Sequence, residues 1–439
     1  MQKIFLTAVI FFVTLTICAV TSAKDELSLE DAEINLVCAT CSLGAYSDDE
    51  SFLLRSMLTA RGWKIETLSR KNNRADAKAY LVSKGNVKIL TVAGTESLKD
   101  VEVDFRAGRV HLHDNSAPLD PTEQNSGNKL FVHRGFRDYA DVVLGDGVLE
   151  YLKTSLGKNP NEKLYLTGHS LGGSVAVIAG LRLVDAGIPK ERFKVITFGS
   201  MAACSRALAE SYADKIDVTR IAMKGDVLKK SMRVLGFVHF GETLKYRQSV
   251  TDDHFEHKMA VYLDCAIRDY YEAGGTFGYD AADKVNAKIY AAPILFVKEN
   301  FHKADREIIF SALNDSLANH FGNLVFADEV SVTVKEKNFF DADFDEYIAA
   351  AKSHGCDYTL IRILRAKKIR DARSGDRAVT MEEIIFDANG FPLSMQTSGA
   401  TTENLTMLEA ALAAQEILTA DAKIFLSTRN TGQLKVTVK

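Results

Sequence analysis

The chain has 439 residues, of which 46% are hydrophobic and 26% charged, a composition that excludes an intrinsically disordered, collagen-like or polytopic membrane protein. Its 54 basic and 58 acidic residues give a formal net charge of −4, so no overall positive charge favours nucleic acid as a partner. The length predicts two or three domains, and we favour two.

The first 23 residues have the pattern of a secretory signal peptide. Lys3 gives a positive start, residues 4–20 carry no charge, and small residues precede the expected cleavage after Ala23. An uncleaved membrane anchor is the alternative, because the apolar run is near the lower length limit for a spanning helix. We therefore expect an exported protein, periplasmic or secreted, whose mature chain begins at Lys24.

Five of the six cysteines lie beyond this segment, which contains Cys18. Cys38 and Cys41 have C-x-x-C spacing, but no second pair completes a zinc site. Export favours a local disulfide or buried thiols over a redox motif at this position.

An α/β rhythm then runs to about residue 275. A helix is expected over residues 29–60. Short apolar strands that each end near a glycine are expected at 87–92, 163–167, 193–198 and 218–223, and helices at 135–156, 171–186 and 202–212. This alternation predicts an open, mostly parallel sheet covered on both faces, in a domain of residues 24–275.

The pattern changes after residue 275. Strands are expected at 288–297, 324–334 and 358–364, and helices at 304–321, 344–353 and 407–418. This order predicts a second, smaller α/β domain over residues 285–439. Binding of an envelope component or lipid, packing and dimerisation all stay open as its role.

Residues 168–173 read GHSLGG and lie where an expected strand gives way to a helix. G-x-S-x-G alone is a weak pattern, but a strand, a sharp turn and a helix around it indicate a nucleophile elbow. The strained backbone at the central serine needs small neighbours, which Gly168 and Gly172 provide. Ser170 is therefore the candidate nucleophile.

A serine nucleophile needs a base and an acid that orients the base. In an α/β-hydrolase these follow in the order serine, acid, histidine. Asp226 follows the strand 218–223, whereas the rival acid Asp217 precedes it. His254 and His257 lie further along and are both candidates for the base.

With these residues in view, residues 29–270 resemble the class 3, fungal-type lipases of the α/β-hydrolase fold. Seven motifs follow the order of that family, namely VAGT at 92–95, VHRGF at 132–136, GHSLGG at 168–173, TFGS at 197–200, RIAMKGDVLKK at 220–230, VHFG at 238–241 and HKMAVY at 257–262. Val92 and Ala93 depart from the Phe-Arg of the family, and Leu228-Lys229 from its Val-Pro.

The resemblance implies a role for each candidate residue. Ser170 would be the nucleophile, His257 the base and Asp226 the acid. The H-x4-Y spacing from His257 to Tyr262 favours His257 over His254. The backbone N–H groups of Leu171 and Thr95 would form the oxyanion hole. His133, His169 and His239 are expected to be structural.

The implied activity is that of an exported serine carboxylic-ester hydrolase, a lipase that cleaves acylglycerol esters. A phospholipase acting on glycerophospholipids is one alternative, and a non-catalytic envelope-binding protein that keeps the hydrolase fold is another. A lipid or ester substrate and a peripheral membrane or envelope contact are expected, without nucleic acid, metal or cofactor, because no metal or nucleotide motif occurs. Since every chemical motif lies before residue 275, we also expect the segment 24–275 to be active alone on a soluble ester.

Overall fold

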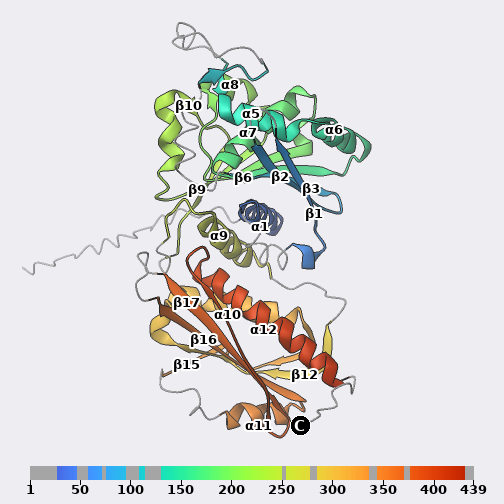
Figure 1. Cartoon of the computed structure of the whole chain (residues 1–439), viewed down its shortest axis with the longest axis vertical. Coiled ribbons are helices and arrows are strands. Elements are labelled where there is room, and N and C mark those ends of the chain that lie inside the picture. Colours follow the sequence, from blue (N-terminus) through green and yellow to red (C-terminus); the bar gives the residue numbers. More distant parts are fainter. Residues whose placement is uncertain are drawn as a thin grey trace, which may run out of the picture.

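The computed structural model describes residues 27–46, 58–71, 76–94, 108–113, 130–249, 254–276, 284–335, 344–369 and 376–430. Two units, each built on a seven-stranded sheet, follow one another along the long axis of the molecule (Figure 1). The expected signal peptide, residues 1–23, lies outside the described residues. We propose that the two domains have the limits expected from the sequence, residues 24–275 and 285–439.

The first unit contains a mostly parallel sheet, as the sequence predicts. Its order is β1-β2-β3-β6-β7-β9-β11, in which β1, β2 and β3 pair antiparallel and every later pair is parallel. The strands are β1 Lys64–Lys71, β2 Asp76–Lys84, β3 Val87–Val92, β6 Lys163–His169, β7 Phe193–Phe198, β9 Val218–Met223 and β11 Glu242–Tyr246. The parallel strands β6, β7 and β9 direct their carboxyl ends to one edge, where the candidate residues follow them.

Helices cover both faces of this sheet (Figure 1). One face carries α5 Arg134–Leu144, α6 Val148–Lys158 and α7 Leu171–Asp185, and the other carries α1 Leu29–Gly44 and α9 Met259–Glu272. A four-stranded sheet of order β10-β8-β5-β4 and the short helix α8 (Arg206–Tyr212) complete the unit. The strands of this small sheet are β4 Arg109–Val110, β5 Val132–His133, β8 Cys204–Ser205 and β10 Phe237–Val238. The α/β architecture expected from the sequence is confirmed.

The expected helix 135–156 is two helices, α5 and α6. Between them Asp146 and Gly147 have φ angles of 45° and 85°. A left-handed backbone cannot continue a right-handed helix. The Gly-Asp-Gly sequence at 145–147 therefore ends one helix and begins the next.

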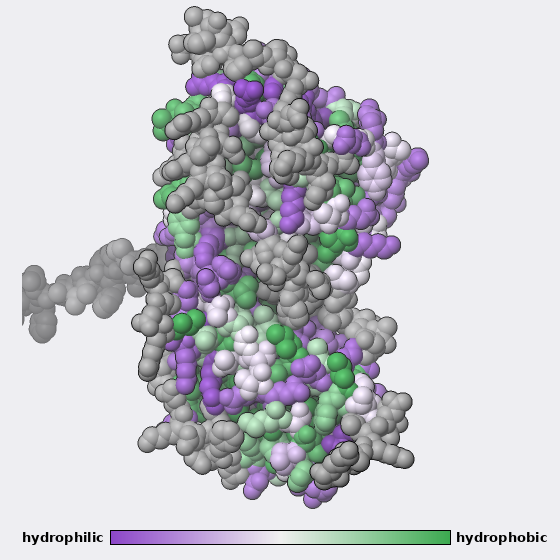
Figure 2. Space-filling model, in the orientation of Figure 1, coloured by the Kyte–Doolittle hydropathy of each residue, from purple (hydrophilic) through white to green (hydrophobic). Residues whose placement is uncertain are grey.

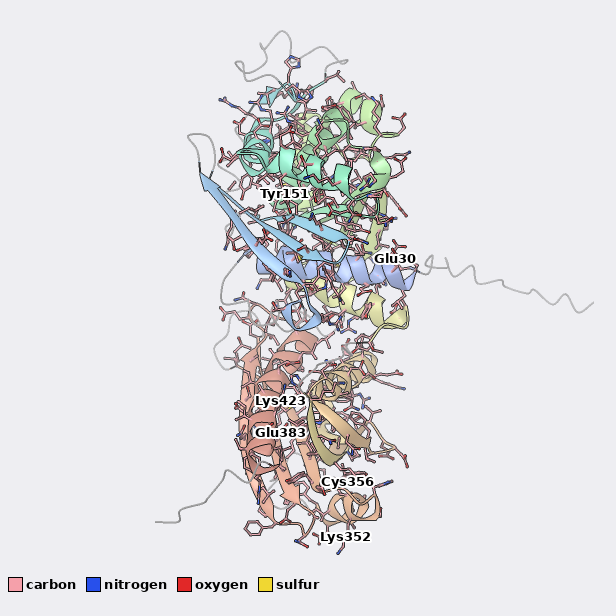
Figure 3. The ribbon with its side chains drawn as sticks, turned by 90° about the vertical axis from the view of Figure 1, so that its right-hand side faces the viewer. Glu30, Tyr151, Lys352, Cys356, Glu383 and Lys423 are labelled. Atoms are coloured by element: carbon pink, nitrogen blue, oxygen red, sulfur yellow. The ribbon has the colours of Figure 1, made fainter. Side chains whose placement is uncertain are left out.

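The second unit has a sheet of order β14-β12-β16-β13-β15, with the hairpin β17-β18 paired to β16. Its strands are β12 Val285–Ala291, β13 Ile294–Val297, β14 Phe321–Phe326, β15 Ser331–Val334, β16 Tyr358–Lys368, β17 Arg377–Asp387 and β18 Pro392–Thr401, and its helices α10 Lys303–Ala318, α11 Asp345–Ser353 and α12 Met407–Asn430. The expected strand 288–297 is divided at Pro293, which lacks the N–H that a ladder needs. The side view places Glu383 and Lys423 in this unit and Glu30 on α1 of the first (Figure 3).

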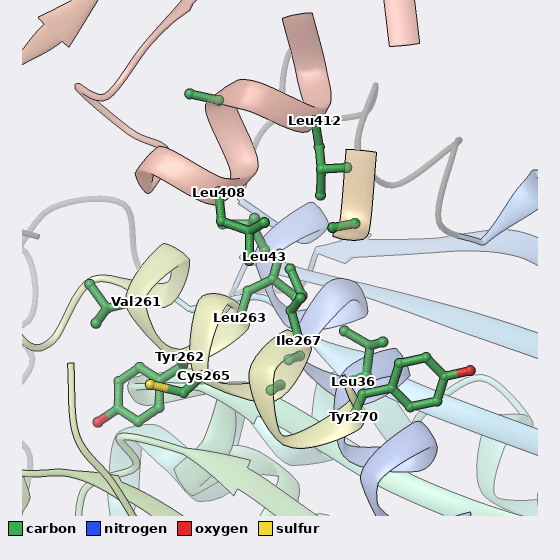
Figure 4. Packing of buried hydrophobic residues seen from close by; sticks show 14 of the residues in the cluster. Leu36, Leu43, Val261, Tyr262, Leu263, Cys265, Ile267, Tyr270, Leu408 and Leu412 are labelled. Atoms are coloured by element: carbon green, nitrogen blue, oxygen red, sulfur yellow. The ribbon is translucent and has the colours of Figure 1, made fainter. Parts of the chain in front are cut away.

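One hydrophobic core passes from the first unit into the second. Side chains of α1 and α9 pack with side chains of α10 and α12 in a single buried cluster. Figure 4 shows Leu408 and Leu412 of α12 beside Leu43 of α1 and Leu263 and Ile267 of α9. The two sheets are therefore joined by packed helices.

The visible surface of both units mixes hydrophilic and hydrophobic residues (Figure 2). In the part of the chain that the structure describes, no helix is both long enough and apolar enough to span a bilayer.

Candidate active site

The turn between β6 and α7 holds Ser170 in a strained backbone conformation. Its φ of 56° and ψ of −121° make it one of two non-glycine residues with positive φ among those the structure describes. Such a conformation costs on the order of 1–3 kcal/mol and is kept where the surroundings impose it. The elbow predicted from the sequence is thus present in the backbone geometry.

Gly168 and Gly172 let the elbow close tightly. A Cβ atom on Gly168 would lie 2.5 Å from the carbonyl carbon of Gly172, and one on Gly172 would overlap the carbonyl oxygen of Val92. No side chain fits in either place. These two glycines therefore bring α7 against β6 and against the end of β3.

Three side chains that are far apart in the sequence form one hydrogen-bonded chain. His257 Nε2 lies 2.9 Å from Ser170 Oγ, and its Nδ1 lies 2.8 Å from Asp226 Oδ2. All three residues are buried. This is the arrangement in which an imidazole takes a proton from serine while a carboxylate fixes its tautomer.

The carboxylate of Asp226 is held by further donors. Tyr262 Oη donates to Oδ2 at 2.7 Å, and the backbone N–H of Leu228 donates to Oδ1 at 2.9 Å. Burial opposes ionisation, but these hydrogen bonds and the nearby imidazole outweigh it and hold the pKa of Asp226 below its ordinary value. The acid is therefore ionised and aimed at His257 Nδ1.

Tyr262 has a second role that the sequence did not reveal. Its hydroxyl accepts a hydrogen bond from the backbone N–H of Met223, the last residue of β9, at 3.1 Å. Burial and the charge of Asp226 raise the pKa of Tyr262, so it stays a donor. The spacing from His257 to Tyr262 thus reflects a tyrosine that ties the acid to the strand before it.

The rival residues lie elsewhere. His254 Nε2 contacts the backbone carbonyl of Thr402 in the second unit. Asp217 lies at the opposite end of β9, where its carboxylate is 3.6 Å from Lys194 Nζ. The structure therefore brings His257 and Asp226 to Ser170, and brings neither rival there.

Of the two expected oxyanion donors, one is described. Leu171 begins α7 directly after Ser170, so its N–H belongs to the first turn of that helix, where N–H groups have no intrahelical partner. Thr95 lies outside the described residues. The N-terminal end of α7 also carries the partial positive charge that favours a developing anion.

The remaining sequence expectations concern histidines and cysteines. His133 is the N-cap of α5, where its Nδ1 accepts from the N–H of Phe136. The described cysteines are all buried free thiols, namely Cys38, Cys41, Cys204, Cys265 and Cys356. The alternative of a local disulfide between Cys38 and Cys41 is therefore not observed. Within the described ranges no cluster of three or more His, Cys, Asp or Glu could hold a metal ion.

Part of the chain matches a known protein family. Residues 89–235 match the lipase (class 3) family. This stretch is therefore similar to the class 3 lipases. It contains Ser170 and Asp226, and His257 follows it in the chain. The resemblance inferred from the seven motifs is thereby confirmed for these residues.

Two curated relatives are similar to part of this chain. The chloroplastic phospholipase A1 of Arabidopsis thaliana is 30% identical over 118 residues, which are 26% of this chain and 18% of that protein. The secreted mono- and diacylglycerol lipase A of Penicillium camembertii is 31% identical over 98 residues, 22% of this chain and 32% of the relative. The match thus spans less than a third of either relative's length.

Solved structures of fungal lipases are also similar to this chain. The native lipase–propeptide complex of Rhizomucor miehei has a TM-score of 0.40 and 20% sequence identity, covering 51% of this chain and 70% of that one. The lipase of Rhizopus microsporus var. chinensis has a TM-score of 0.40 and 17% identity, covering 53% of this chain and 78% of that one.

Proposed function

We propose that this chain is a serine carboxylic-ester hydrolase that cleaves acylglycerol esters. The observation that carries the proposal is the hydrogen-bonded chain from Ser170 through His257 to Asp226, built on a strained elbow. Its place at the carboxyl ends of parallel strands in a stretch similar to the class 3 lipases supports the same conclusion.

The first half of the reaction forms an acyl-enzyme. Ser170 Oγ attacks the ester carbonyl carbon while His257 Nε2 takes the hydroxyl proton. The tetrahedral oxyanion receives hydrogen bonds from the N–H of Leu171 and, by analogy with the family, from that of Thr95. His257 then gives its proton to the departing alkoxide, so an alcohol leaves and the acyl group stays on Ser170.

The second half releases the acid. Water attacks the acyl carbonyl as His257 takes a proton from it, and the same proton returns to Ser170 Oγ when the acyl–oxygen bond breaks. Asp226 stays ionised throughout and stabilises the imidazolium that forms in each half.

Two variants test the assignment. Ser170→Ala and His257→Ala should each lower kcat for a soluble p-nitrophenyl ester by about 10⁴-fold or more, and the double variant should be no worse than either single one, because the residues act as a unit. Ser353→Ala, which changes a serine of α11, is the control and should keep parental kcat. A phosphonate ester should label Ser170, and labelling elsewhere would refute the assignment.

A phospholipase is the second candidate. The observation that favours it is the 30% identity to a phospholipase A1 over 118 residues. A panel of triglyceride, diglyceride and glycerophospholipid substrates distinguishes the two by the ratio of kcat/KM. No turnover of any ester, with an unlabelled Ser170, would instead support the non-catalytic, envelope-binding alternative.

We also propose that the chain is exported and meets its lipid substrate at a membrane or envelope surface. The charged start, apolar run and small residues of positions 1–23 support export. The measurement is N-terminal sequencing of the protein recovered outside the cytoplasm, which should begin at Lys24. A chain that keeps its first 23 residues would support the anchor instead.

A further inference from the structure

The short segment that carries His257 is bonded to the second unit on both sides of the imidazole. Three residues before it, His254 Nε2 contacts the carbonyl oxygen of Thr402. One residue after it, Lys258 Nζ donates to the carbonyl oxygen of Glu403 at 2.7 Å. These are consecutive carbonyls of the connection between β18 and α12, so two donors that flank His257 bind adjacent acceptors on one short segment.

The same connection continues into the helix that follows His257. Thr406 Oγ1 donates to Asp264 Oδ2 of α9 at 3.1 Å, and both residues are buried. Thr406 is also fixed within its own unit, because its N–H donates to the carboxylate of Glu409 at 2.7 Å in a reciprocal cap of α12. The connection therefore has a defined geometry of its own when it meets α9.

A buried ion-pair network lies behind these contacts. Arg268 of α9 lies 2.5 Å from Asp264 and 2.8 Å from Asp305 of α10, and Ser249 Oγ donates to Asp305 at 2.8 Å. The two aspartates are 1% and 2% exposed, so water cannot replace these partners. Polar contacts of the second unit thus reach residues on both sides of His257, before it at Ser249 and after it on α9.

We propose that the connection of residues 402–406 is a positioning element for the base His257. The imidazole must keep Nε2 2.9 Å from Ser170 Oγ and Nδ1 2.8 Å from Asp226, although it lies on a short segment between β11 and α9. Holding that segment at His254, Lys258 and α9 fixes where the ring is presented. This inference rests on the proposed hydrolase function and gives the second unit a part in it.

Positioning and simple packing between units make different predictions. A contact that only stabilises the fold affects the unfolding temperature and leaves the turnover of each folded molecule unchanged. A contact that positions the base lowers kcat and leaves KM nearly constant, because the misplaced group acts in the transition state and not in substrate binding. A displacement of about 1 Å at a catalytic group costs up to about a hundredfold in rate.

The experiment uses the full chain with His254→Ala and Lys258→Met combined. The readouts are kcat and KM for p-nitrophenyl butyrate, with competent sites counted by phosphonate titration, and the unfolding temperature by circular dichroism. We expect kcat per titrated site to fall by about tenfold or more, with KM within about twofold of the parent.

Two matched variants complete the design. His254→Gln with Lys258→Arg keeps a donor at each position and should restore kcat to within about threefold of the parent. Lys153→Met removes an exposed lysine of α6, far along the chain from the connection, and should change nothing.

The outcomes separate the inference from the function on which it rests. Parental kcat in the double variant, or an equal loss in the donor-keeping variant, would overturn the positioning role while leaving the hydrolase intact. If the combined change prevents folding, the two single variants decide by the same criterion. An inactive parent protein whose Ser170 takes no phosphonate would refute the hydrolase function itself.

Discussion

His169 Nε2 lies 2.7 Å from the backbone carbonyl oxygen of His257, so the residue before the nucleophile holds the backbone of the base. A carbonyl accepts only from a protonated nitrogen, which places the single proton of a neutral ring on Nε2 and leaves Nδ1 as an acceptor for the hydroxyl of Tyr46. Burial, with the adjacent His257, lowers the pKa of His169, which keeps the ring neutral.

Replacing His169 with leucine should therefore lower kcat by about tenfold or more, because the carbonyl of His257 loses its donor and the imidazole is less firmly held. Tyr46→Phe should have a smaller effect, since it removes only the hydroxyl donor to Nδ1 and leaves the hydrogen bond from Nε2 to the carbonyl of His257. Steady-state kinetics on a soluble ester, with sites counted by titration, measures both. Equal activity of His169→Leu and the parent would show that the contact is unimportant for turnover.

Gly199, directly after β7, lies against the acid and the base. Its φ is 55°, and a Cβ atom there would lie 2.8 Å from Tyr262 Oη, 3.1 Å from Asp226 Oδ2 and 3.2 Å from His257 Cε1. Gly199→Ala should therefore displace the acid–base pair and lower kcat by about a hundredfold.

The control for Gly199 is Gly187→Ala. Gly187 has a φ of 81°, but a Cβ atom there would meet no other atom within 4 Å, so the variant carries the cost of the left-handed backbone alone. That cost is about 1–2 kcal/mol of stability, and kcat should stay parental. If both variants lose turnover equally, backbone strain and not the contact with the triad is the cause.

The sequence predicted the elbow and the strands around it because their signals are local. Residues 163–167 and 193–198 are apolar runs that end near glycine; the first lies within β6, and the second is β7. Ser170 and Asp226 could be chosen from their order along the chain, since each follows an expected strand, and His257 was favoured by its H-x4-Y spacing to Tyr262. The contacts that hold them could not, because Tyr46 and His169 are 123 residues apart.

Other strands of the two sheets were not predicted from the sequence. Strands β1 and β2 at one edge of the first sheet, and the hairpin β17–β18, were not expected from the sequence. Each of these strands is identified in the structure by the neighbouring strand with which it pairs. The change of pattern near residue 275 was visible, but the buried cluster that crosses it was not, since it joins α9 to α12 more than a hundred residues later.

We expect His133 to make the stability of the fold sensitive to acid. Burial lowers the pKa of His133 from 6.5 to about 4, and its cap on α5 needs an unprotonated Nδ1. Because the folded pKa lies below the unfolded one, the stabilisation is complete above about pH 6.5 and is lost as the pH falls towards 4. The difference corresponds to about 3 kcal/mol of unfolding free energy at most.

Denaturant unfolding at several pH values between 7 and 4 measures this loss. His133→Asn keeps a side chain that caps helices well but cannot gain a proton, so its unfolding free energy should fall less steeply over that range than the parent's. Burial also lowers the pKa of His169, so protonation of His169 destabilises the fold in the same way. The unfolding free energy of the His133→Asn variant should therefore still fall as the pH is lowered. Identical slopes would mean that His133 does not couple folding to protonation.

The segment 24–275 is the sharpest test of how the two units depend on each other. From the motifs alone, it should fold and hydrolyse a soluble ester at a near-parental rate. The structure favours the opposite, because Leu263 and Ile267 of α9 belong to a core shared with α12, and Arg268 loses its partner Asp305 when the second unit is removed. Each fully buried leucine or isoleucine contributes about 1.5–3 kcal/mol when it is kept from water.

We therefore expect the segment 24–275 to aggregate or to unfold at a lower temperature than the full chain. The molecules that stay folded should hydrolyse p-nitrophenyl butyrate at least about tenfold more slowly per titrated site, because His254 and Lys258 lose the carbonyls of Thr402 and Glu403. Co-expression with residues 285–439 as a separate chain should restore solubility and turnover together, since the contacts that are lost are noncovalent. A monomeric 24–275 segment with parental kcat would instead show that the first unit holds His257 without help.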